Sequence, residues 1–94
     1  MATFLLFGSY SMESIKQISA GRTQQATALI EANGGKVISG YALLGKKDLI
    51  LILELPDTQA AIKTSVGLTK MLGVSFTTAP AVSFEEFDNL TADI

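Results

Sequence analysis

Asp48 and Glu54 are the first residues of this sequence whose chemistry suggests a site, because two neighbouring carboxylates can divide acid and base work on one substrate. They flank an aliphatic run and stand six positions apart. In a strand, the alternation of side chains puts both on the face that carries Ile50 and Ile52. At about 3.3 Å per residue the two carboxylates lie roughly 20 Å apart, so they do not form a catalytic pair.

Each carboxylate taken alone has two interpretations. Glu54 can act as an acid or base at the mouth of a barrel, or it can cap a strand end near Asp57 or pair with a lysine. We prefer the structural interpretation. Asp48 follows Gly45 in a predicted turn, where an aspartate bonds well to nearby backbone amides, so we expect it to stabilise the turn.

Three further side chains can bind a small molecule. Tyr41 and Tyr10 each offer a phenol to a ligand in an apolar cavity, although a rim or core aromatic is the more common role. Arg22 is the only arginine, and its guanidinium can hold a carboxylate or phosphate through two parallel bonds. A lone surface arginine is more often simply solvated, and that is what we expect here.

The composition excludes several classes of function. Histidine and cysteine are both absent, which removes disulfides, zinc and iron–sulfur sites, histidine-bound haem and histidine-based nucleophilic relays. We therefore predict no cofactor and no metal. The net charge of −2 argues against a nucleic-acid surface. No apolar run is long enough to span a membrane and the N-terminus makes a poor signal peptide, so we expect a cytoplasmic protein.

The elements that must position these residues follow from the hydrophobic pattern. It predicts strand, helix, strand, strand, helix and strand over residues 3–9, 12–33, 36–44, 48–55, 58–72 and 74–84. Gly21 predicts a kink or split in the first helix, and Pro80 places the second half of the last strand at a sheet edge or at a bulge. Residues 1–87 then form one domain, and the polar tail 88–94 is expected to be loose.

This order predicts an α+β, ferredoxin-like βαββαβ fold, in which a four-stranded antiparallel sheet carries two helices on one face. The other face is then bare. The first and third strands are apolar on both sides, and Leu5, Phe7, Ile50 and Ile52 are the candidates for the uncovered side. Because large apolar side chains are costly to leave in water, we expect a second copy to cover them.

The sequence also resembles a known family. Residues 41–48, Tyr-Ala-Leu-Leu-Gly-Lys-Lys-Asp, followed at 54–57 by Glu-Leu-Pro-Asp, resemble the hallmark segments of GYD-domain proteins, although Lys47 stands where that family has a tyrosine. The resemblance implies a small bacterial protein of the dimeric α/β-barrel group. It implies a ferredoxin-like protomer, a sheet-to-sheet homodimer and no established reaction.

Two functions are compatible with these observations. The first is a non-catalytic module that binds a small apolar or aromatic ligand between the sheets, or that assembles with itself as a homodimer or larger oligomer. Small residues such as Gly8 and Gly40 would leave the gap, with Tyr41 and Glu54 as its polar groups. The alternative is a cofactor-independent oxygenase or isomerase acting on a small aromatic substrate. The lack of histidine, the usual proton shuttle at neutral pH, favours the module.

Overall fold

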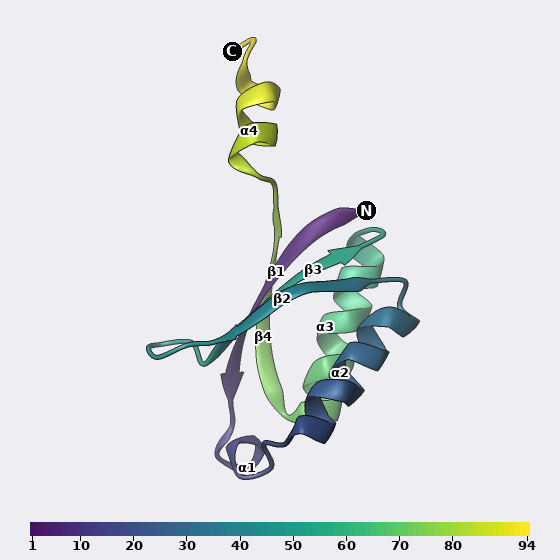
Figure 1. Ribbon diagram of the computed structural model, residues 1–94, viewed down its shortest axis with the longest axis vertical. Helices are drawn as coiled ribbons and strands as arrows, with labels where there is room; N and C mark the ends of the chain where they lie inside the picture. The colour runs from purple at the N-terminus through teal and green to yellow at the C-terminus, as the bar shows by residue number, and fades with distance from the viewer.

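A four-stranded antiparallel sheet with its two long helices on one face forms the body of the protein, seen in a computed structural model that describes residues 1–94 (Figure 1). The strands lie in the order β2-β3-β1-β4. This arrangement confirms the predicted α+β, ferredoxin-like topology. The elements in chain order are β1 (Ala2–Tyr10), α1 (Met12–Ile15), α2 (Ala20–Ala32), β2 (Lys36–Ala42), β3 (Leu49–Leu55), α3 (Thr58–Leu72), β4 (Val74–Ala81) and α4 (Phe84–Thr91).

The helices begin and end where local chemistry satisfies their free backbone groups. The predicted split of the first helix occurs, because Ser19 caps a new start and accepts a hydrogen bond from the amide of Arg22. Asp57 caps α3 in the same way, with Oδ1 accepting from the amide of Ala60 at 2.8 Å. Gly73 ends α3 at φ 69°, a left-handed conformation that glycine adopts most easily.

The last strand ends at Ala81 and not at residue 84 as predicted, and the chain after it also differs from the prediction. The tail expected to be loose from residue 88 is helical through Thr91, because Ser83 caps α4 by accepting a hydrogen bond from the amide of Glu86 at 3.0 Å. Figure 1 shows α4 projecting beyond the end of the sheet, clear of α2 and α3. Pro80 lies on the edge strand β4, where its missing N–H costs no ladder bond.

Alternation along the strands separates the two faces of the sheet. Phe4 and Leu6 of β1 are buried toward the helices, and Leu53 of β3, which pairs with Phe4 in the register, is buried beside them. The buried core under the helices consists of Phe4, Leu6, Ile30, Leu53, Leu55, Ala61 and Leu68. Residues of opposite parity point to the other face, which no helix covers (Figure 1).

Candidate functional site

The uncovered face of the sheet, which we call the open face, carries a patch of large apolar side chains. The register pairs Leu5 with Ile52 and Phe7 with Ile50, so the four residues form two adjacent cross-strand pairs on β1 and β3. All four side chains are partly exposed to solvent. The sheet therefore places the four candidates for an interface side by side.

Tyr41 extends this patch toward the edge strand β2. It lies directly opposite Ile50 in the register and is 60% exposed. By parity its side chain shares the open face, a point that the sequence left undecided. On β2 the phenol therefore borders the apolar patch next to Ser39, which lies opposite Ile52.

Glu54 lies on the same face but at its far end. It stands between Lys36 of β2 and Thr3 of β1 in the register, four positions along β3 from the residue that pairs with Tyr41. Four residues of strand correspond to about 13 Å, so one protomer does not bring this carboxylate and the phenol together. The expected convergence of Tyr41 and Glu54 on one gap is therefore absent within a protomer.

Asp48 has a structural position at the start of β3. Its Oδ2 accepts a hydrogen bond from the amide of Tyr10 at 2.8 Å, and its own amide donates to the carbonyl of Gly8 at 2.9 Å. The carbonyl of Asp48 accepts from Leu43 at 2.8 Å, across the hairpin. The residue thus ties the end of β1 to the β2–β3 hairpin, which is close to the turn-stabilising role expected of it.

Arg22 is not simply solvated, and that expectation was wrong. Its Nη1 donates to the carbonyl of Ser14 and its Nη2 to the carbonyl of Leu72, each at 2.6 Å. A guanidinium presents two parallel donors, and here they satisfy backbone oxygens at the ends of α1 and α3. Arg22 therefore joins three helices, and both of its terminal nitrogens already have partners.

Gly8 and Gly40, which were expected to leave a gap between two sheets, lie on the helical face instead. A Cβ on Gly8 would approach side-chain atoms of Leu49 and Phe76 to 2.9 Å, so this space is already filled. Gly40 and Ala42 line a cleft of about 360 Å³ beneath α2, together with Tyr10 and with Tyr41, which lies between them in β2. The register places Gly40 and Ala42 opposite Leu51 and Leu49 on the helical face, so the space that they leave opens on that side.

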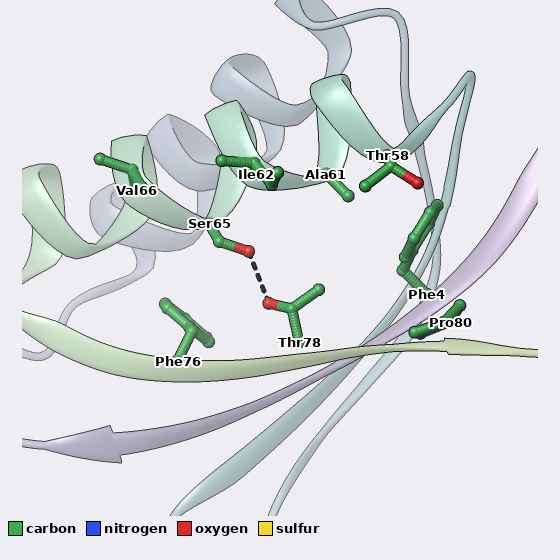
Figure 2. Close-up of a pocket in the computed structure, with 9 residues that line it drawn as sticks. All are labelled: Phe4, Thr58, Ala61, Ile62, Ser65, Val66, Phe76, Thr78 and Pro80. Carbon is green, nitrogen blue, oxygen red and sulfur yellow. Dashed lines mark hydrogen bonds between the residues drawn. The ribbon is translucent and has the colours of Figure 1, made fainter.

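A second cleft, between α3 and β4, was not foreseen from the sequence. It has a volume of about 310 Å³ and is mainly apolar (Figure 2). Within it the hydroxyls of Ser65 and Thr78 are hydrogen-bonded at 2.5 Å, while Ile62 and Val66 stand on its rim at 60% and 54% exposure. The signal that could have revealed it is this Ile62/Val66 pair, four positions apart on a helix face that the core does not use. The lining residues are Phe4, Thr58, Ala61, Ile62, Ser65, Val66, Phe76, Thr78 and Pro80.

Neither a metal centre nor a membrane span stands out in the structure. No three acidic side chains gather in a way that could hold a metal ion. None of the helices combines the length and the apolar character that crossing a bilayer requires. The two clefts and the open face are therefore the candidate binding surfaces of this structure.

Comparison with known protein families gives one match that covers most of the chain. The profile of the GYD domain matches residues 4–91, which is nearly the whole chain and includes the segments at 41–48 and 54–57. The chain belongs to the GYD domain family. A search of curated proteins finds no match to this GYD protein.

Two solved structures share the fold of the GYD protein. One is described as the leucine response regulatory protein LrpA of Mycobacterium tuberculosis, with a TM-score of 0.58, 11% identity and 87% of this chain covered. The other, described only as a glutamate-to-alanine mutant, has a TM-score of 0.58, 12% identity and the same coverage. The chain spans about half the length of both, 51% and 50% respectively. At this identity the similarity establishes the fold alone.

Proposed function

We propose that this GYD protein is a self-associating module in which the open faces of two copies pack together and hold a small apolar or aromatic molecule between them. The observation that carries the proposal is the contiguous patch of Leu5, Phe7, Ile50 and Ile52 on a face that no helix covers. Fully burying such a side chain is worth about 1.5–3 kcal/mol relative to water. A second copy offers the same patch and therefore a matching apolar surface.

The polar residues of the open face support binding more than catalysis. Tyr41 borders one end of the apolar patch and Glu54 the other, beside Lys36, so the phenol and the carboxylate lie about 13 Å apart along the strands. Asp48 already accepts a hydrogen bond from a backbone amide. A phenol beside an apolar surface suits the orientation of a bound aromatic molecule, since ligand sites are mostly apolar with a few placed polar groups.

The self-association is tested by Ile52→Lys. Because Ile52 points away from the helices, a lysine there stays solvated in a lone protomer but is forced into the interface of a dimer. We expect Ile52→Lys to lose the sheet-to-sheet pairing and therefore to show a lower mass than the wild type by light scattering, with an unchanged fold by circular dichroism. Gln25→Lys, on an exposed position of α2, is the matched control and should leave the mass unchanged. An Ile52→Lys protein that keeps the wild-type mass and melting temperature refutes the interface.

Ligand binding is tested by a thermal-shift screen of small aromatic and acidic metabolites. A compound that binds only the folded state raises the melting temperature. We expect Tyr41→Phe to reduce that rise, and Tyr10→Phe, which lies opposite the buried Val74 on the helical face of the sheet, to leave it unchanged. The proposed ligand site is refuted if no compound raises the melting temperature of the wild type, or if the rise is the same in Tyr41→Phe. The open face is then an assembly surface alone.

A further inference from the structure

The C-terminal helix α4 has an apolar stripe without a partner. Phe84, Phe87 and Leu90 recur at helical spacing and are 89%, 53% and 61% exposed, and no residue of α4 is buried. A helix this short is marginal in water on its own, so its stability depends on packing against another surface. Figure 1 shows that its own protomer provides none, since α4 projects away from the body of the fold.

The charges of α4 indicate which kind of partner surface would complement it. The helix contains Glu85, Glu86 and Asp88 and no basic residue. It therefore presents a negative face beside an apolar stripe. A complementary partner is an apolar groove with a positive border.

The cleft between α3 and β4 has that character. Ile62 and Val66 form an exposed apolar rim above the phenyl ring of Phe76 (Figure 2). The same helix carries Lys63 and Lys70 and contains no acidic residue, and β4 is uncharged. The cleft is thus apolar inside and positive along its helical border.

Every copy of the chain therefore carries an acidic apolar helix and a basic apolar cleft at different places on its surface. Only Val82 and Ser83 connect β4 to α4, and Ser83 is extended, with φ −67° and ψ 161°, and already serves as the helix cap. This connection continues the direction of the strand, so α4 points away from its own cleft (Figure 1). The occupant that the geometry favours is the helix of another copy.

We propose that α4 of one copy docks in the cleft between α3 and β4 of a second copy. The apolar stripe of α4 lies over Ile62, Val66 and Phe76, and its carboxylates face Lys63 and Lys70. This contact is separate from the proposed sheet-to-sheet interface, because Phe76 and Thr78 pair with residues on the helical face of β1. It therefore does not rest on the function proposed above.

The proposed contact is tested by disulfide cross-linking between introduced cysteines, which is specific because the sequence contains no cysteine of its own. Leu90→Cys and a size-tagged Val66→Cys protein are mixed and oxidised mildly, and the mixed disulfide is measured on a non-reducing gel. We expect a yield at least about tenfold above that with tagged Gln24→Cys, an exposed position on α2 outside the cleft. A yield no higher than this control overturns the proposal. So does a Leu90→Cys/Val66→Cys double variant that forms its disulfide within one chain in preference to between chains.

Charge reversal tests the assigned contact surface. Glu85→Lys/Glu86→Lys in the Leu90→Cys protein should lower the cross-linking yield several-fold, and Lys63→Glu/Lys70→Glu in the Val66→Cys protein should restore it. A yield that is indifferent to reversal overturns the assignment of α4 to this cleft. Repeating the mixture in an Ile52→Lys background separates the two interfaces, because the cross-link is expected to persist there even if the open faces no longer associate.

Discussion

Arg22 gives the sharpest test of how the helical layer is held together. Its guanidinium donates to the carbonyls of Ser14 and Leu72 at 2.6 Å each, and those carbonyls lie at the ends of α1 and α3. A hydrogen bond that involves a charged group contributes about 1.5–3 kcal/mol. The side chain is only partly buried, so we take the lower figure for each bond, and expect Arg22→Met to cost about 3 kcal/mol of unfolding free energy.

Arg22→Lys separates the shape of the donor from its charge. An ammonium is a point charge and does not reproduce the planar fork that reaches both carbonyls, so this variant should lose about half of the effect. In a domain of this size each kcal/mol corresponds to roughly 4–8 °C in melting temperature. We therefore expect decreases on the order of 15 °C for Arg22→Met and half of that for Arg22→Lys.

The assay is thermal denaturation followed by circular dichroism, at one fixed protein concentration because self-association makes melting temperatures concentration-dependent. Gln24→Met, on an exposed position of the same helix, is the control and should change little. Melting of Arg22→Met within about 2 °C of the wild type would show that the two short hydrogen bonds contribute nothing net.

Two further predictions concern single atoms of the fold. Thr64 is fully buried and its hydroxyl has no hydrogen-bond partner. Thr64→Val keeps the shape of the side chain and should raise the unfolding free energy, measured by urea titration, by about 1 kcal/mol. A urea midpoint below that of the wild type contradicts this prediction. Thr23→Val, on an exposed position of α2, is its control. Gly21→Ala should stabilise α2 by about 0.5–1 kcal/mol, because a Cβ there meets only Ser19 Oγ at 3.7 Å, whereas Gly73→Ala should cost about 1 kcal/mol, since φ is 69°. A loss of stability in Gly21→Ala, or a gain in Gly73→Ala, would contradict this reasoning.

The boundaries of most helices and strands could be predicted from the sequence, because the residues that set these boundaries act locally. Asp57 and Gly73 bracket α3, and Pro80 marks an edge strand, since a cap, a left-handed turn and a missing N–H act on the nearest backbone. The one element missed was α4. Its apolar residues are exposed and its cap is a single serine, so composition alone resembled a polar tail.

The sequence by itself determined the order of the elements, the antiparallel hairpin and the presence of an uncovered sheet face, because these depend on hydrophobic period and on turn residues that lie close together in the chain. Only the tertiary structure decided what each strand residue faces. The run from Leu49 to Leu55 is apolar on both sides, so its parity is set by the register with β1 and by the helices that bury Leu53 and Leu55. The same holds for Arg22, whose partner Leu72 is fifty positions away. Its role depends on how α2 and α3 pack, and no local pattern of residues encodes that distance.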